Sequence, residues 1–135
     1  MITYHWQVSP GKVDFKPLYE QNGWTRYLDD WAKTERAIRQ AASLAALEGE
    51  QVLGLARGVS DGETVLYLQD LLVLPERQHQ GIGTALVKQM LGRFPNVGQV
   101  VLIAEPTAQA QSFYQQFGFK SVGAQYGNAM VLDRR

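Results

Sequence analysis

A glycine-containing loop near the middle of the chain is the first candidate for chemistry. The stretch ERQHQGIGTAL runs from Glu76 to Leu86 and places Gly81 and Gly83 one residue apart. Glycines leave backbone N–H groups unobstructed, so such a loop can hold a phosphate group. The following stretch, GTALVKQMLGRF, has the pattern of a helix. The first-turn N–H groups and positive dipole end of that helix would face the anion.

Two common phosphate-binding schemes do not fit this loop. A P-loop requires Lys-Ser or Lys-Thr after its second glycine, and no such pair follows a glycine here. A dinucleotide fingerprint requires a third glycine, where Leu86 stands, and an early place in a longer strand–helix array. What remains is a strand, Pro75, a short polar loop and a helix whose N-terminus meets the anion.

Two stretches resemble motifs of the GNAT family of N-acetyltransferases. LLVLPERQHQGIGTALV is similar to the family's acyl-CoA-binding motif, Arg/Gln-x-x-Gly-x-Gly/Ala, at Gln78, Gly81 and Gly83. AQAQSFYQQFGFK is similar to the family's late helix and strand, A-x-x-F-Y-x-x-x-G-F. The matching positions there are Ala110, Phe113, Tyr114, Gly118 and Phe119. The resemblance spans essentially the whole chain and implies a GNAT fold.

The resemblance implies acetyl-CoA as co-substrate and indicates where it binds. Backbone groups around Leu72, Val73 and Leu74 would pair with the amides of pantetheine, as a strand added to the sheet. Many family members carry an asparagine near the pantetheine where Thr107 stands, and Thr107 could make a similar contact or cap the late helix. Backbone N–H groups would bind the pyrophosphate from Gln78, His79, Gln80, Gly81, Ile82, Gly83 and Thr84.

Tyr114 and Asp70 are the candidate catalytic residues. The family places a tyrosine at the position of Tyr114, close to the thioester sulfur, where it acts as general acid; the alternative is a core tyrosine on an apolar helical stripe. On the expected strand LYLQDLLVL, Asp70 lies on the same face as four leucines. Its carboxylate therefore needs a polar partner or a position on a cleft. It is either the general base, acting through a bridging water, or a structural carboxylate paired with Arg57 or a backbone N–H. Glu105, Glu76 and His79 are weaker candidates for the base.

Trp24 and Tyr27, followed by an acidic pair, lie where this family builds its acceptor pocket. Aromatic rings beside carboxylates suit a cationic or aromatic amine. The alternative is that Trp24 and Trp31 are core residues at a helix junction. The chain also resembles the plant-type serotonin acetyltransferase branch and its bacterial relatives, although its end, GNAMVLDRR, departs from that branch.

The expected function is therefore acetyl transfer from acetyl-CoA to a primary amine of a small molecule. The chain has no cysteine, so direct attack in a ternary complex is expected rather than a cysteine-linked acetyl-enzyme. The alternatives are a protein or peptide acetyltransferase and a non-catalytic acyl-CoA sensor. The apolar C-terminal strands could also pair two copies as a homodimer.

The elements that position these residues form a mixed α/β fold in a single domain, residues 1–135. We expect strands, two helices, a hairpin around SDGE, and strand–helix units carrying the two motifs. The expected ranges are strand 1–8, helix 13–23, helix 29–49, hairpin strands 51–59 and 64–75, helix 83–94, strand 99–105, helix 106–118, and closing strands 119–123 and 128–133.

Composition excludes several classes of protein. The 135 residues are 45% apolar with a formal net charge of zero, which fits a globular protein and argues against a nucleic-acid binder. Two distant histidines and no cysteine argue against a metal site. No stretch approaches the ~18 apolar residues of a membrane span, and no signal peptide is recognised. We therefore expect a cytoplasmic protein without a membrane partner.

Overall fold

The chain folds around a five-stranded sheet, in a computed structural model that describes residues 1–123 and 125–135. It divides into two compact units, Met1–Leu102 and Ile103–Arg135. The first unit contains all five strands and the second contains the last helix. In chain order the elements are β1 (Ile2–Trp6), α1 (Lys16–Gln21), α2 (Trp31–Gln40), β2 (Ala42–Glu48), β3 (Gln51–Ser60), β4 (Val65–Val73), α3 (Ile82–Arg93), β5 (Gln99–Leu102) and α4 (Ala108–Gln115), with short 3-10 helices at Thr25–Leu28 and Pro75–Arg77.

The sheet has the order β1-β2-β3-β4-β5. Its first four strands pair antiparallel, and β5 pairs parallel with β4. The pairing with β5 joins only residues 65–68 of β4. The second half of β4, residues 69–73, therefore has no strand beside it on that edge within the described residues. This open edge lies directly before the glycine loop.

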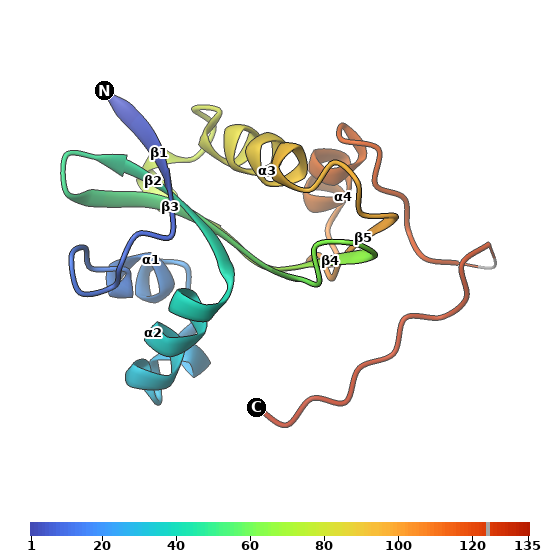
Figure 1. Ribbon diagram of the computed structural model, residues 1–135, viewed down its shortest axis with the longest axis horizontal. Coiled ribbons are helices and arrows are strands. Elements are labelled where there is room, and N and C mark those ends of the chain that lie inside the picture. Colours follow the sequence, from blue (N-terminus) through green and yellow to red (C-terminus); the bar gives the residue numbers. More distant parts are fainter. Residues whose placement is uncertain (124) are drawn as a thin grey trace. The chain divides into compact units, whose positions relative to one another are not determined.

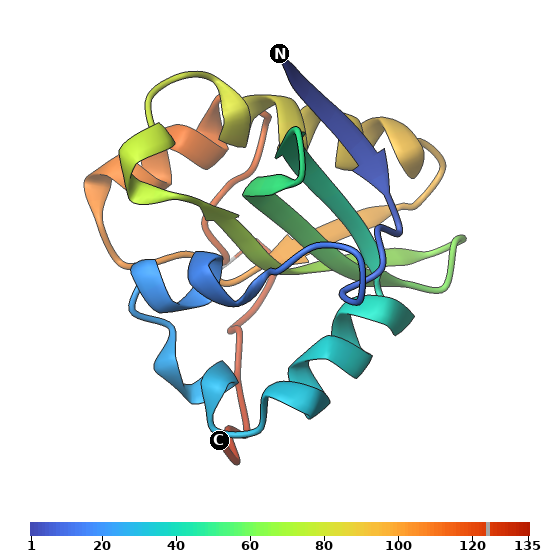
Figure 2. The ribbon, with the colours of Figure 1, turned by 90° about the vertical axis from the view of Figure 1, so that its left-hand side faces the viewer.

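Helices cover both faces of the sheet in the first unit. Figure 1 shows α1 and α2 on one side of the sheet and α3 on the other, and Figure 2 shows the same arrangement from the side. Both faces bury apolar side chains, among them Leu18 and Ile38 from the first pair of helices and Leu86 and Met90 from α3. Burial of these side chains holds β4 and the start of α3 in fixed positions.

The second half of one expected helix is a strand in the structure. Residues 29–49 were expected to form a single helix, but α2 ends at Gln40 and residues 42–48 form β2. The interpretation was wrong because alanine and leucine favour helices in isolation, while tertiary burial decides here. Five consecutive residues of β2, from Ser43 to Leu47, are buried, which a strand between two other strands and two helical layers permits. The start of α2 was predicted correctly, since the side chain of Asp30 accepts a hydrogen bond from the backbone N–H of Lys33.

The expected closing strands are also wrong. Residues 119–123 and 128–133 form neither strand nor helix. A strand needs a neighbour to satisfy its backbone groups, and β5 is the last strand of the sheet in the described part of the chain. The other expected elements are present, with shifted ends.

Candidate active site

The glycine loop leaves the N-terminus of α3 open. His79 and Gly81 adopt left-handed backbone conformations, with φ of 64° and 85°. Gly81 is the N-cap of α3 and supplies no side chain to the first-turn N–H groups. Those N–H groups have no partner within the helix, and the helix dipole adds positive potential there. The loop can therefore receive an anion such as a pyrophosphate through main-chain groups.

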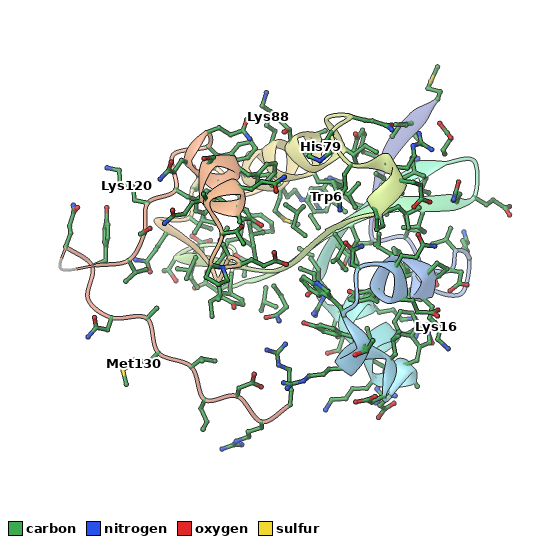
Figure 3. All side chains as sticks on the ribbon, turned by 180° about the vertical axis from the view of Figure 1, so that it is seen from behind. Trp6, Lys16, His79, Lys88, Lys120 and Met130 are labelled. Atoms are coloured by element: carbon green, nitrogen blue, oxygen red, sulfur yellow. The ribbon has the colours of Figure 1, made fainter. Side chains whose placement is uncertain are left out.

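Arg77 fixes the start of this loop to the neighbouring strand. Its Nη1 atom lies 3.1 Å from a carboxylate oxygen of Glu48 at the end of β2, and its Nε donates to the side chain of Gln80 at 3.2 Å. The hydrogen bond and charge of Arg77 lower the pKa of Glu48. His79 is exposed in the loop, and Lys88 lies further along α3 (Figure 3). Arg77 thus serves to position the loop, because its charge is already paired.

The open edge of β4 offers backbone groups from alternate residues. The N–H of Leu74 donates to the C=O of Leu53 on β3 at 2.9 Å. Because backbone groups alternate in direction along a strand, Leu72 also faces β3, whereas Leu71 and Val73 face the open edge. The sequence predicted that backbone groups around Leu72, Val73 and Leu74 pair with the pantetheine amides. The geometry adds Leu71 to this set, whereas the N–H of Leu74 is already bonded to β3.

The C=O of Val73 is itself engaged by side chains. It accepts hydrogen bonds from Asn22 Nδ2 at 3.1 Å and from Gln78 Nε2 at 3.3 Å. Gln78, the first residue of the glycine motif, therefore fixes the loop to the end of β4. The open strand edge and the open helix N-terminus thus belong to one stretch of chain, from Leu71 to Thr84, in which the backbone N–H groups of Arg77 and Gln78 already donate to Leu74 and Pro75.

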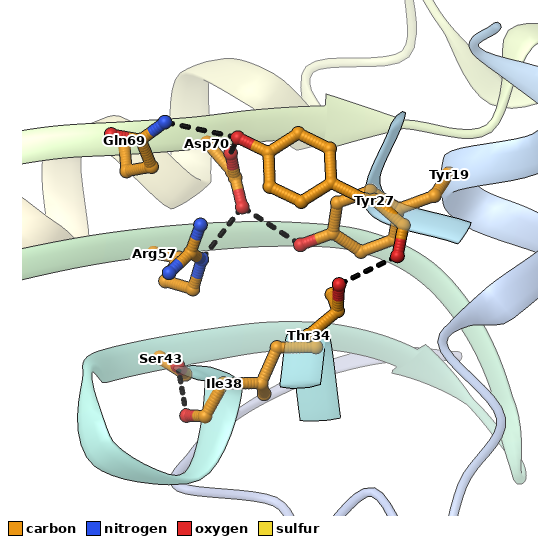
Figure 4. Close-up of polar contacts among 8 residues, drawn as sticks. All are labelled: Tyr19, Tyr27, Thr34, Ile38, Ser43, Arg57, Gln69 and Asp70. Carbon is orange, nitrogen blue, oxygen red and sulfur yellow. Dashed lines mark hydrogen bonds and ion pairs between the residues drawn. The ribbon is translucent and has the colours of Figure 1, made fainter. Parts of the chain in front are cut away.

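Asp70 lies at the centre of a buried polar cluster (Figure 4). One carboxylate oxygen accepts hydrogen bonds from Arg57 Nε at 2.6 Å and from the hydroxyl of Tyr19 at 2.7 Å. The other accepts from the hydroxyl of Tyr27 at 3.1 Å, and that hydroxyl accepts from Gln69 Nε2 at 2.9 Å. Asp70 is 1% exposed, as the four leucines of its parity indicated. The strand register places Arg57 directly opposite Asp70.

The electrostatics of the cluster keep both tyrosines neutral and Arg57 charged. Burial and the charge of Asp70 raise the pKa of Tyr19 and of Tyr27. Burial acts to lower the pKa of Arg57, but the charge and hydrogen bond of Asp70 raise it above its usual value. The geometry matches the structural alternative for Asp70, in which it pairs with Arg57. The half-buried Tyr27 links the buried Asp70 to the outside of the cluster through its hydroxyl.

Half-buried aromatic rings surround the exposed side of this cluster. Trp24 stacks on Tyr27 with ring centres 5.8 Å apart, and Tyr19 packs against both rings and against Trp31. The backbone C=O of Tyr27 is held by the hydroxyl of Thr34 at 2.6 Å. The predicted acceptor residues Trp24 and Tyr27 therefore lie together, and Tyr27 donates a hydrogen bond to the predicted base, Asp70.

Thr107 and Tyr114 belong to the second unit. Thr107 caps α4, accepting a hydrogen bond from the N–H of Ala110 at 3.1 Å, as one of the two interpretations required. Tyr114 is half-buried and packs edge-on against Phe113 and Phe119. Burial and the charge of Glu105 raise the pKa of Tyr114, so its hydroxyl is protonated at neutral pH. A protonated phenol is able to act as a general acid.

Sequence reasoning missed Tyr19, Gln69 and Leu71. Tyr19 lies in the expected helix 13–23, and only a buried carboxylate nearby could have indicated its role. The described residues contain no group of three or more acidic or histidine side chains placed to hold a metal ion. No helix in the described part of the chain has the length and apolar character of a membrane span.

Comparison with known proteins gives a consistent family match. The sequence profile of the Acetyltransferase (GNAT) family matches residues 4–119. A solved GNAT family acetyltransferase of Streptococcus pneumoniae is 36% identical, with each chain fully covered and a TM-score of 0.84. A solved GNAT family acetyltransferase of Elizabethkingia anophelis, which contains bound acetyl-CoA, is 17% identical, covers 90% of this chain and 78% of its own, and has a TM-score of 0.69.

A curated relative, an uncharacterised N-acetyltransferase of Gracilaria tenuistipitata var. liui, is 30% identical over 113 residues. The match covers 78% of this chain and 60% of that protein. Across four curated relatives, the matched share of the relative ranges from 28% to 60% of its length.

Proposed function

The chain belongs to the acetyltransferase (GNAT) family, and from this premise we propose that it transfers an acetyl group from acetyl-CoA to a primary amine of a small molecule. The observation that carries the proposal is the single stretch of chain that joins the open edge of β4 to the uncapped N-terminus of α3. Its two parts suit the two polar parts of coenzyme A, an extended chain of amides and a pyrophosphate.

The proposed binding mode follows the direction of the backbone groups. The pantetheine amides pair with Leu71 and Val73 at the open edge, with Leu72 and Leu74 contributing by contact. The pyrophosphate receives N–H groups from residues 79–84, since the N–H of Gln78 already donates to the C=O of Pro75. The bound acetyl-CoA of the Elizabethkingia anophelis protein supports the choice of co-substrate. Thr107 retains a hydroxyl hydrogen beyond its role as helix cap and is a further candidate contact.

The proposed reaction is a direct attack of the amine on the thioester. The amine, with an ordinary pKa near 10, must first lose its proton. Tyr27 belongs both to the half-buried aromatic rings and to the buried cluster around Asp70. We therefore assign its hydroxyl to relay this proton to Asp70. The C–N bond then forms as the C–S bond breaks, and the nitrogen releases its second proton to solvent, from which Tyr114 regains the proton it gives to the thiolate. A backbone N–H at the β4 edge stabilises the oxyanion, and Tyr114 protonates the leaving thiolate.

The same cluster indicates the kind of amine. Because Arg57 already neutralises Asp70, the carboxylate nearest the Tyr27 hydroxyl carries no uncompensated negative charge. A polycation gains little there, whereas a monoamine with an aromatic or apolar body can stack on Trp24 and Tyr27 and place its nitrogen at the Tyr27 hydroxyl. An aromatic monoamine is therefore the proposed acceptor class.

Replacing Tyr114 with phenylalanine tests whether the protein is a catalyst. The change removes one hydroxyl and keeps the ring packing, so we expect unchanged acetyl-CoA affinity and a turnover lower by about 100-fold, the usual scale for a general acid. Turnover can be followed as thiol release and affinity by calorimetry. Tyr126→Phe, at an exposed position in the same unit, is the matched control. Equal turnover in wild type and Tyr114→Phe would remove the acid role.

A further inference from the structure

Gln69 is an extra residue in β4. Its neighbours Leu68 and Asp70 pair with two adjacent residues of β3, so Gln69 has no partner on that side. On the other side, the pairing with β5 ends at Leu68. Successive side chains of a strand ordinarily point to opposite faces, but a bulge of this kind re-aims one of them. Gln69 can therefore bond the same hydroxyl as its neighbour Asp70, that of Tyr27 (Figure 4).

The hydrogen bonds around Asp70 fix which end of the Gln69 amide faces Tyr27. The carboxylate of Asp70 pairs with Arg57, and a carboxylate in its charged form only accepts hydrogen bonds. The hydroxyl hydrogen of Tyr27 therefore goes to Asp70, with 3.1 Å between the two oxygens. The Tyr27 oxygen is left as an acceptor, so Gln69 presents its Nε2 to that oxygen at 2.9 Å. The Oε1 atom of Gln69 is consequently turned away from the hydroxyl.

The Oε1 atom of Gln69 is open to a ligand. Gln69 is half-buried, and among the described residues no donor bonds its Oε1. Every fully buried side-chain nitrogen or oxygen in that part of the chain has a partner. An Oε1 without a partner is therefore reachable from solvent. Since Oε1 and Nε2 belong to one planar amide, this free carbonyl oxygen lies beside the Tyr27 hydroxyl, at the place assigned above to the amine nitrogen.

We propose that the side-chain carbonyl of Gln69 binds the amine that receives the acetyl group: its Oε1 accepts one N–H of the amine while the Tyr27 oxygen accepts another. The inference rests on the proposed function, because it places the amine at Tyr27. An ammonium group carries N–H groups for both oxygens, and a hydrogen bond from a charged donor is stronger than one between neutral groups. Once a proton has passed through Tyr27, the bond to Gln69 still holds the nitrogen. Gln69 thus orients the attacking nitrogen and selects one that carries hydrogens.

Binding of a matched pair of ligands tests this contact without turnover. Phenethylamine is an aromatic monoamine, and its N,N,N-trimethyl derivative keeps the ring and the positive charge but has no N–H group. We expect Gln69→Met, which has a similar length but no carbonyl, to weaken phenethylamine binding by at least about 10-fold, the scale for a hydrogen bond from a charged group. Binding of the trimethyl derivative should be unchanged. Calorimetric titration of the protein saturated with coenzyme A measures both affinities.

Two further variants serve as controls. Gln51→Met makes the same change at an exposed position on β3 and should bind both ligands as the wild type does. Gln69→Glu keeps a side-chain oxygen at the same place and should bind phenethylamine at least as tightly as the wild type. Unchanged phenethylamine binding in Gln69→Met, or an equal loss for both ligands, would overturn the proposal. An equal loss of phenethylamine binding in Gln69→Met and Gln69→Glu would overturn it as well.

Thiol release from acetyl-CoA in the presence of phenethylamine separates this inference from the proposed function. If the wild type acetylates phenethylamine and Gln69→Met binds and acetylates it equally well, only the contact with Gln69 is refuted. If the wild type binds neither ligand and acetylates no amine, the acetyl transfer and the contact are both contradicted.

Discussion

Replacing Gly83 with valine is expected to abolish measurable acetyl-CoA binding while the protein stays folded. Gly83 is the second residue of α3, among the first-turn N–H groups assigned to the pyrophosphate. A β-branched side chain there would crowd the approach of a phosphate to those groups. We expect the affinity to fall by at least about 100-fold, equivalent to about 2.8 kcal/mol. Calorimetric titration with acetyl-CoA measures this loss directly.

Gly92→Val provides the matched control. Gly92 lies near the other end of the same helix, and a Cβ atom added there meets no atom within 4 Å. Both variants carry the same change in helix propensity, so thermal unfolding should shift by similar amounts. Wild-type affinity in Gly83→Val would contradict the assignment of the loop.

Replacing Asp70 with asparagine is expected to reduce both stability and turnover. The asparagine would leave the buried charge of Arg57 without a counter-charge and would point an N–H₂ group toward the hydroxyl of Tyr19 or Tyr27. Breaking a buried ion pair at one partner costs about 3–5 kcal/mol of the free energy of unfolding. Removing the final acceptor of the amine proton should also lower turnover by about 100-fold or more. Denaturant unfolding and thiol release measure the two effects separately.

The double variant Arg57→Gln/Asp70→Asn distinguishes these effects. With both charges removed, no isolated buried charge remains, so most of the lost stability should return. Turnover should stay low if Asp70 receives the amine proton. Recovery of turnover together with stability would show that Asp70 acts only by supporting the fold, and acetyl-CoA affinity should remain near that of the wild type in both variants.

Local patterns predicted the elements around the glycine loop well. The hairpin turn SDGE, the helix after Gly81 and the late helix at Thr107 each have a start or stop signal in a few adjacent residues. ASLAALE was misread because its residue types favour a helix, and only its place between β1 and β3 makes it a strand. The closing strands were misread because the segment has the composition of a strand. In the structure, its described residues pair with no neighbouring strand.

The candidate site was predictable only where local sequence patterns determine it. The alternation along β4 correctly indicated that Asp70 is buried. Arg57 lies opposite it only because the register of β3 and β4 shifts by one residue between Arg57 and Gly58. The contributions of Tyr19 and Gln69 depend on long-range contacts that no local pattern contains. The direction of each backbone group along β4 depends on its register with β3, which is why Leu71 became visible only in the structure.

The most direct test of the account follows both products of the reaction at once. The protein is given acetyl-CoA labelled in the acetyl group and, in turn, aromatic monoamines, polyamines, aminoglycosides, amino acids and lysine peptides; free thiol and labelled amine are then quantified. The account predicts equal amounts of thiol and acetylated amine, with aromatic monoamines turned over fastest. Acetyl-CoA binding without thiol release from any mixture, or labelled acetyl found only on the lysine peptides, would contradict transfer to a small-molecule amine.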